Sequence, residues 1–183
     1  MKYIGKYLPE YTYEDYKEWK GDWELIEGIP YAMSRASKRE HQYLAKKILI
    51  QLEEELENCK KCETYYELDW IISERTTIRP DLMVVCGDFE EDFLEFPPSI
   101  VFEVLSKSTA LKDRNIKSKI YQAHNVKYYC LVNPQNQMIE VFELKNEVYQ
   151  LVLETSTENF IFSVHNCKAE IDFSKIWKRK KGA

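Results

Sequence analysis

Apolar residues recur with a helical period in two long parts of the chain. In the first part an apolar residue stands at every fourth position, at Leu44, Ile48, Leu52 and Leu56. This spacing predicts a helix from about residue 38 to residue 58, which buries one side only because charged residues occupy its other faces. Ser37 and Glu40 form a capping-box pair and indicate where this helix begins.

The second part with a helical period is "LKDRNIKSKIYQAHN". Ile116, Ile120 and Ala123 lie on one face of the predicted helix, and Asn125 is placed at its end. A shorter amphipathic helix is predicted near the N-terminus, in "YTYEDYKEW". The helical parts of the pattern are thus separated by segments with a different period.

These other segments are rich in β-branched and aromatic residues and predict strands. "WELIEGIPYAMS", with Gly28 between two apolar halves, predicts a β-hairpin. One strand each is expected in "CETYYELDWII", "TTIRPDLMVVC" and "SIVFEVLS", and the acidic loop "GDFEEDFLEFPP" separates the last two. Three more strands follow in "KYYCLVNP", "MIEVFELKN" and "VYQLVLET", and residues 160–177 are expected to add a strand and a short closing turn or helix.

Together these elements predict the fold class, a mixed α/β domain with a central β-sheet flanked by helices. An N-terminal hairpin and C-terminal strands are additions to that sheet. Several connections are hairpin-short, so the sheet cannot be all parallel. The 183 residues suit one domain spanning 1–183, and no internal repeat or linker divides them.

Composition limits the function classes without choosing one. The formal net charge of −5 has the wrong sign for a protein that coats itself with nucleic acid, although local charge matters more than the sum. Two basic clusters are interpreted as solvated surface: residues 35–47 contain Arg35, Lys38, Arg39, Lys46 and Lys47, and the C-terminus contains Lys178, Arg179, Lys180 and Lys181. Neither a signal peptide nor a membrane-spanning stretch is recognisable, so a cytoplasmic protein without membrane association is expected.

The five cysteines include one close pair, Cys59 and Cys62 in "CKKC". A zinc site needs a second pair, or histidines at ligand spacing, and the sequence shows neither. Cys86, Cys130 and Cys167 stand singly in apolar runs. All five are therefore expected to be reduced thiols, the last three as buried packing residues.

Two acidic residues stand out from apolar surroundings. Asp81 follows Pro80 and opens the run "DLMVV", and Glu103 lies inside "IVFEVL". A buried and unpaired carboxylate is costly. If the two segments are neighbouring strands, both carboxylates can face one side of the sheet, where their repulsion would force a proton onto one of them. A divalent cation removes this conflict, and hard oxygen ligands favour Mg²⁺ or Mn²⁺.

The helix after these strands adds a third element. Asp113, Lys117 and Tyr121 are spaced four residues apart and lie along one face, about 100° from the apolar stripe. Lys117 is therefore expected on the shoulder of the helix, beside the core. A lysine there can orient a water molecule and stabilise negative charge that develops at a phosphate.

The ordered motifs resemble those of a known family. "RPDLMVV" with Asp81, "VFEVLS" with Glu103, "DRNIKSKIY" and "HNVKYYCLVNP" are similar to the signature of the Uma-type "putative restriction endonucleases", a bacterial family in the PD-(D/E)XK nuclease superfamily. "WELIEGIPYAMS" and "HQ" extend the resemblance upstream, and "AEIDFSKIW" extends it downstream. The resemblance covers most of the chain, and it implies a restriction-endonuclease-like fold.

The resemblance also implies roles for particular residues. Asp81 and Glu103 would bind Mg²⁺ or Mn²⁺ with help from the main-chain carbonyl of Val104, and Lys117 would position the attacking water. The superfamily pattern has a lysine two residues after the glutamate, where this sequence has Leu105. In the Uma-type family that lysine is thought to have moved to the following helix, where Lys117 stands.

Other residues are candidates for accessory roles. Related nucleases often take one more metal ligand from an upstream glutamate, for which Glu40 and Glu27 qualify. The capping box favours a structural role for Glu40, and a plain hairpin role is the alternative for Glu27. His41 is positioned to touch a phosphate or to be exposed at the helix start. Asp113 shares the face of Lys117, and Tyr121 is a site residue or a packing residue.

The leading hypothesis is a Mg²⁺-dependent endonuclease that hydrolyses DNA by in-line attack of water and leaves a 5′-phosphate. The alternative is a catalytically inactive nuclease fold that binds nucleic acid or protein, which the net charge of −5 favours. A nuclease acting on RNA is a third option. A chain of this size presents one active site, so cutting both strands of a duplex predicts a homodimer.

Overall fold

The structure, a computed structural model, describes residues 8–33, 39–107 and 109–177. Its largest element is a mixed sheet in which six strands of this part of the chain follow the order β10-β9-β8-β7-β6-β3. The strands are β3 (Cys62–Tyr66), β6 (Leu82–Cys86), β7 (Ile100–Val104), β8 (Tyr128–Asn133), β9 (Met138–Lys145) and β10 (Val148–Thr155). Strands β7 and β8 are parallel and the other neighbours are antiparallel, which confirms the mixed sheet.

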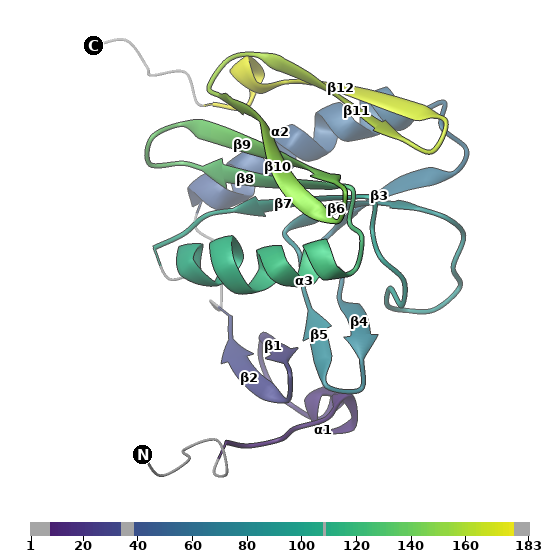
Figure 1. Ribbon diagram of the computed structural model, residues 1–183, viewed down its shortest axis with the longest axis vertical. Helices are drawn as coiled ribbons and strands as arrows, with labels where there is room; N and C mark the ends of the chain where they lie inside the picture. Colours follow the sequence, from purple (N-terminus) through teal and green to yellow (C-terminus); the bar gives the residue numbers. More distant parts are fainter. Residues whose placement is uncertain (1–7, 34–38, 108, 178–183) are drawn as a thin grey trace.

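A second, smaller sheet lies below the first in Figure 1. Within the described residues it has the order β2-β1-β5-β4, formed by β1 (Trp23–Ile26), β2 (Ile29–Ala32), β4 (Trp70–Ser73) and β5 (Thr76–Ile78). The predicted N-terminal hairpin is confirmed, and Glu27 and Gly28 close it with φ angles of 52° and 78°. A Cβ atom on Gly28 would lie 2.9 Å from the end of the Arg75 side chain, which can move aside, so it is the positive φ of the turn that favours glycine. The predicted short helix precedes this hairpin as α1 (Tyr13–Lys17).

Two of the predicted strands were wrong, because each is divided between the two sheets. "CETYYELDWII" forms β3 and β4, with Glu67 in a left-handed conformation (φ 50°) between them. "TTIRPDLMVVC" forms β5 and β6, and the chain leaves one sheet for the other at Arg79 and Pro80. Pro80 has no N–H for a sheet hydrogen bond, which ends the strand there. The acidic residue after this crossing, Asp81, therefore lies at the junction of the two sheets.

The faces of the large sheet are covered by different elements (Figure 1). Helix α2 (Arg39–Leu56) and the hairpin of β11 (Asn159–Val164) and β12 (Cys167–Asp172) cover one face, followed by the short helix η3 (Phe173–Lys175). The segment after residue 160 thus contains most of two strands, where one was predicted. The α2 prediction is confirmed, while Ser37 of its capping box lies outside the described residues.

A helix that links β7 to β8 covers the other face (Figure 1). It begins as a π-helix, η2 (Lys112–Lys117), and continues as α3 (Ser118–Ala123), and Asn125 follows it with a φ of 60°. The predicted helix is confirmed but its buried face was wrong: Ile116 and Ile120 are only half-buried and Ala123 is exposed. The face with Asp113, Lys117 and Tyr121 is the buried one instead.

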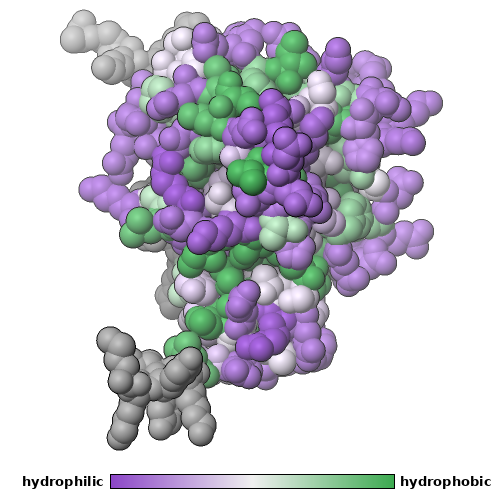
Figure 2. Space-filling model, in the orientation of Figure 1, coloured by the Kyte–Doolittle hydropathy of each residue, from purple (hydrophilic) through white to green (hydrophobic). Residues whose placement is uncertain are grey.

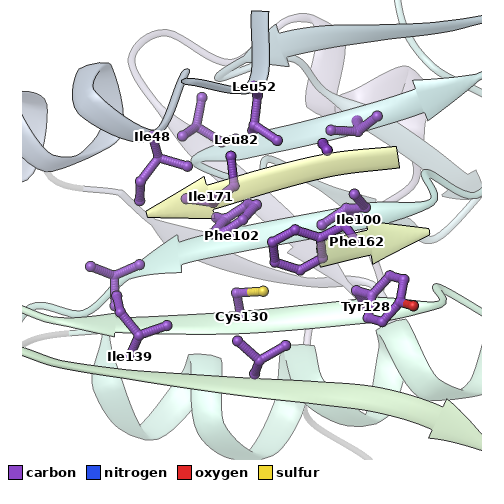
Figure 3. Close-up of a cluster of buried hydrophobic side chains, with 14 of the residues drawn as sticks. Ile48, Leu52, Leu82, Ile100, Phe102, Tyr128, Cys130, Ile139, Phe162 and Ile171 are labelled. Atoms are coloured by element: carbon purple, nitrogen blue, oxygen red, sulfur yellow. The ribbon is translucent and has the colours of Figure 1, made fainter. Parts of the chain in front are cut away.

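Alternation along β7 separates two hydrophobic cores. Phe102 packs with Ile48 and Leu52 of α2 and with Phe162 of β11, as the close-up in Figure 3 shows. Val101 and Leu105, on the opposite face, pack against Tyr121, Trp70 and other residues near α3 and the small sheet. Glu103 lies between Val101 and Leu105 in this alternation, so its carboxylate points into the second core.

Four of the five cysteines are paired in this structure, contrary to the expectation of reduced thiols. Disulfides join Cys59 to Cys167 and Cys62 to Cys86. Cys86 and Cys167 are half-buried at strand ends, and Cys130 alone is a free and buried packing thiol, as predicted. The sequence hides this arrangement because the partners lie 24 and 108 residues apart.

Hydrophilic residues cover much of the surface seen in Figure 2. The first basic cluster is represented in the described residues by Arg39 and Lys46, which are exposed, and by Lys47, which is half-buried. Arg35, Lys38 and residues 178–181 lie outside the described part. No helix in that part is long and apolar enough to cross a membrane.

Candidate active site

Asp81 and Glu103 lie next to each other at the ends of two paired strands. The register of β6 and β7 pairs Leu82 with Phe102, so the next position places Asp81 opposite Glu103. The Asp81 carboxylate also accepts a hydrogen bond of 2.7 Å from the main-chain N–H of Val104. Both acids line one cavity, on the side of the sheet that faces α3.

Lys117 reaches this pair from the π-helix. Its ammonium Nζ lies 2.5 Å from Oε1 of Glu103 and 2.9 Å from Oε1 of Glu24, and donates to the main-chain carbonyl of Arg79 at 3.2 Å. The Lys117 side chain is only 2% exposed. It lies inside the core between two carboxylates, deeper than the shoulder position expected from the sequence. Those carboxylates raise the pKa of Lys117 well above its ordinary value, against the opposing effect of burial.

Glu24 is a site residue that the sequence analysis missed. It lies in β1 of the small sheet, has no exposed surface, and pairs with both Lys117 and Lys112. Burial disfavours its ionised form, but the attraction of Lys117 and Lys112 outweighs burial and lowers the pKa of Glu24 to about 2. Glu24 therefore stays ionised, and it also accepts a hydrogen bond of 3.0 Å from the main-chain N–H of Arg79.

A signal for Glu24 was present in the sequence. "WELI" places a glutamate among apolar residues, as "IVFEVL" does for Glu103. The segment was interpreted only as one strand of a hairpin, so the buried position of Glu24 was not recognised. For Lys112 no comparable signal exists, because it stands in a polar stretch of a helix.

Glu103 has fewer positive groups beside it than Glu24 has, so its ionised form is less well stabilised. Burial raises the pKa of Glu103 well above its usual value, Lys117 lowers it, and the nearby Asp81, Asp113 and Glu24 raise it further. Tyr121 donates a hydrogen bond of 2.5 Å to Oε1 of Glu103. A dry carboxyl group among other acids is the situation that a divalent cation relieves.

Of the remaining predicted accessory residues, His41, Asp113 and Glu40 line the cavity and Glu27 does not. The His41 ring nitrogen Nε2 lies 3.0 Å from Oδ2 of Asp81, and this contact raises the pKa of His41 although burial opposes it. Asp113 is 2% exposed, and burial raises its pKa. Glu40 is exposed at the rim of the same cavity. Glu27 lies apart in the hairpin turn, where its N–H donates to Thr76, and it does not line the cavity.

Arg79 links the site to the small sheet and to α1. Its Nε donates to Asp69 at 2.6 Å, and the hydroxyl of Tyr16 donates to the same carboxylate at 2.8 Å. A further ion pair of 3.1 Å joins Arg79 to Asp22. This network fixes the segment whose carbonyl accepts from Lys117, so the small sheet helps to hold the lysine in place.

The site opens into a cavity of about 620 Å³. Both sheets, α2 and the π-helix contribute to its walls. The charged residues at its base are Glu24, Asp81, Glu103, Asp113, Lys112 and Lys117. The structure thus brings together all the predicted site residues except Glu27.

Comparison with solved structures shows that the fold is shared with another protein. The chain superposes on a crystal structure described as "a putative nuclease belonging to DUF820", from Anabaena variabilis ATCC 29413, with a TM-score of 0.72. The two chains are 12% identical, and the similarity covers 90% of this chain and 96% of that chain. This likeness shows the fold: a mixed α/β architecture shared with a nuclease-fold protein.

A family model narrows the class. The model Uma2, described as "Putative restriction endonuclease", matches residues 12–164. The match spans most of the chain, so the protein belongs to the Uma2 family, as its ordered motifs indicated. No curated protein shows significant similarity to the chain. Family and fold together support a nuclease function in general terms.

Proposed function

We propose that the protein is a Mg²⁺- or Mn²⁺-dependent endonuclease of the PD-(D/E)XK type that hydrolyses phosphodiester bonds in DNA. The observation that carries the proposal is the convergence of Asp81, Glu103 and Lys117 at the base of one cavity. DNA is the substrate class that the family description, "Putative restriction endonuclease", suggests. RNA cleavage is separated from DNA cleavage by offering both substrates.

The residues present fit a divalent cation. Asp81 and Glu103 supply hard carboxylate oxygens, and Val104, whose main chain contacts Asp81, supplies a carbonyl beside them. In the described residues the side-chain contacts of Asp81 involve Oδ2 and those of Glu103 involve Oε1, which leaves the other oxygen of each acid for a cation. A cation would also relieve the burial and repulsion that raise the pKa of Glu103.

When bound, the cation would acidify water and offset charge at the phosphate. The other contributions come from the chain itself. Lys117 orients the water for in-line attack and stabilises the negative charge that develops on the phosphoryl oxygens. Glu24 holds the Lys117 ammonium from the opposite side, and His41 fixes the Asp81 carboxylate through its 3.0 Å contact. The products carry a 5′-phosphate and a 3′-hydroxyl.

A plasmid nicking assay tests this function. With Mg²⁺ or Mn²⁺ the wild-type protein is expected to convert supercoiled DNA to nicked circles, and Asp81→Ala is expected to abolish the conversion. Asp88→Ala is the matched control, because Asp88 is an exposed acid just beyond the other end of β6. Unaltered cleavage by Asp81→Ala would sink the assignment of the site.

One observation favours the second candidate, a nuclease fold that binds nucleic acid or protein without turnover. Lys117 already contacts both Glu24 and Glu103 directly, so each of the two buried acids has a partner without a metal. Calorimetry with Mn²⁺ separates the candidates. Metal binding that is lost in Glu103→Gln supports the enzyme, whereas no uptake at millimolar Mn²⁺ supports the binding module.

Cleavage of both strands of a duplex at one place requires two sites, so we propose that the active form is a homodimer. Sedimentation in the presence of DNA tests this step separately. A dimer that yields linear DNA supports it, and a monomer that yields only nicked circles contradicts it.

A further inference from the structure

Four cysteines from four separate segments meet at one point of the structure. Cys59 follows α2, Cys62 opens β3, Cys86 ends β6 and Cys167 opens β12. The sulfur atoms of Cys59, Cys62 and Cys167 lie within 4.8 Å of one another, and Cys86 is bonded to Cys62. The cluster lies at the opposite end of β6 from Asp81, so it does not belong to the candidate active site.

The spacing within this cluster is that of a thiolate metal site. Cys59 and Cys62 form a C-x₂-C pair, and two further cysteines complete the four sulfur ligands of a structural zinc site. As a disulfide, the Cys59–Cys167 pair has an ordinary Cα–Cα separation of 5.9 Å, but the Cα atoms of Cys62 and Cys86 lie only 4.0 Å apart. That separation is below the range of about 4.4–6.8 Å usual for a disulfide.

Main-chain hydrogen bonds hold the Cys59–Cys62 loop in place independently of the sulfur atoms. The N–H of Cys59 donates to Leu56 at 2.8 Å, at the end of α2. The carbonyl of Lys61 accepts from the N–H of Gly87 at 2.9 Å, which ties the loop to the residue after Cys86. The loop is therefore prepared for binding by its backbone.

A lysine adjoins three of the four cysteines in the sequence. Lys60 and Lys61 lie between the first two cysteines, and Lys168 follows Cys167, and all three lysines are exposed. Nearby ammonium groups stabilise thiolates and offset the net charge of −2 that four thiolates and one Zn²⁺ carry. The interior Cys62 is 3% exposed, so the site is closed on one side by the core.

We propose that Cys59, Cys62, Cys86 and Cys167 bind one Zn²⁺ ion as four thiolates, in place of the two disulfides. Four sulfur ligands leave no open coordination position, so the ion is structural rather than catalytic. It joins the end of α2, the β3–β6 edge of the large sheet and the β11–β12 hairpin. Binding to four neutral thiols releases four protons, which makes the affinity depend on pH. This site is independent of the proposed nuclease function.

Zinc content tests the proposal directly. The protein is purified under reducing conditions without a chelator, and its zinc is measured by mass spectrometry. About one zinc per chain is expected, with loss in Cys86→Ser and in the fourfold serine variant of the cluster. Cys130→Ala is the matched control, because Cys130 is the free and buried cysteine outside the cluster, and it is expected to keep the metal.

A second measurement uses the wild-type protein alone, so it tests the site even if the variants do not fold or if zinc is lost during purification. Reduced wild-type protein is titrated with Co²⁺, and one equivalent is expected to give the visible absorption of tetrahedral cobalt thiolate. Two outcomes overturn the proposal. One is neither zinc nor a cobalt spectrum in wild type, with peptide mapping that shows the Cys59–Cys167 and Cys62–Cys86 disulfides. The other is zinc retained by the fourfold variant.

Discussion

Glu24 and Glu103 share one ammonium group: Nζ of Lys117 lies 2.9 Å from Oε1 of the first and 2.5 Å from Oε1 of the second. The two acids nevertheless respond in opposite ways. Burial acts against the charge of both, but Glu24 has Lys112 as a second partner and its pKa falls to about 2. Glu103 has only a share of Lys117 and faces other acids, so its pKa rises. Glu24 therefore holds the lysine in place, and Glu103 is the acid whose charge a bound cation would stabilise.

Lys117→Met is expected to slow cleavage strongly and to destabilise the fold. The loss of positive charge at the phosphate should lower turnover about 10²–10³-fold. The free energy of unfolding should fall by about 3–5 kcal/mol, because buried carboxylates lose their partner. Lys112→Met is the matched control, since Lys112 contacts Glu24 but not Glu103. A folded Lys117→Met protein that cleaves at the wild-type rate in the nicking assay would contradict the role of the lysine.

Glu24→Gln should change how stability depends on pH. A shift of the Glu24 pKa from 4.5 to about 2 corresponds to stabilisation on the order of 3 kcal/mol at neutral pH. Because the pKa is lower in the folded protein, this contribution is complete above pH 4.5 and disappears as the pH falls toward 2. Urea unfolding of wild type and variant measures it. A difference that stays constant across this interval, or one that Glu27→Gln reproduces, would disprove the explanation.

His41→Asn should remove a contact that is strongest at low pH. The pKa of His41 is raised in the folded protein, so its stabilisation is complete below the ordinary value of 6.5 and is lost as the pH rises through the folded-state pKa. The expected cost at low pH is about 1.5 kcal/mol, as for a hydrogen bond to a charged group. His165→Asn, in the exposed β11–β12 turn, is the control. The result to look for is a gap between the two variants in urea unfolding that narrows toward alkaline pH.

Tyr121→Phe should cost more stability than Tyr129→Phe. The first change removes the 2.5 Å hydrogen bond to the buried carboxyl of Glu103, at a cost of about 1–3 kcal/mol. The second removes a bond of 2.8 Å from Tyr129 to the main-chain carbonyl of Asp113, at a cost of about 1 kcal/mol. Both tyrosines are buried, so packing losses are matched. Equal costs in thermal or urea unfolding would mean that Glu103 does not depend on Tyr121.

Two acids of the site, Asp81 and Glu103, were predictable because a charged residue beside apolar ones is visible in the local sequence. Asp81 opens an apolar run and Glu103 lies inside one, and adjacency of their strands then places them together. The second sheet was not predictable in this way, because β5 and β6 follow each other with only Arg79, Pro80 and Asp81 between them. Nothing local shows that the chain changes sheets there.

The position of Lys117 was predicted only in part. A regular period of 3.6 residues puts the Ile116–Ile120 stripe against the core and Lys117 beside it. The segment Lys112–Lys117 is a π-helix, whose hydrogen bonds span five residues, so the faces rotate relative to that period. Pairing Lys117 with two buried acids stabilises the fold more than burying Ile116 and Ile120 would. A hydrophobicity scale does not include such pairing, so the sequence pattern pointed to the wrong face.

The order in which the chain is made gives the crossover helix a further meaning. Glu24, Asp81 and Glu103 are all synthesised before Lys117. The helix that carries the lysine accepts a hydrogen bond at Asp113 from Tyr129 of β8, a strand that pairs in parallel with β7 and is made later still. A growing chain therefore holds the acids without their lysine. If the proposed function is right, a ribosome-bound fragment that ends before Lys117 cannot cut nucleic acid. Activity is expected only after the later strands have joined the sheet.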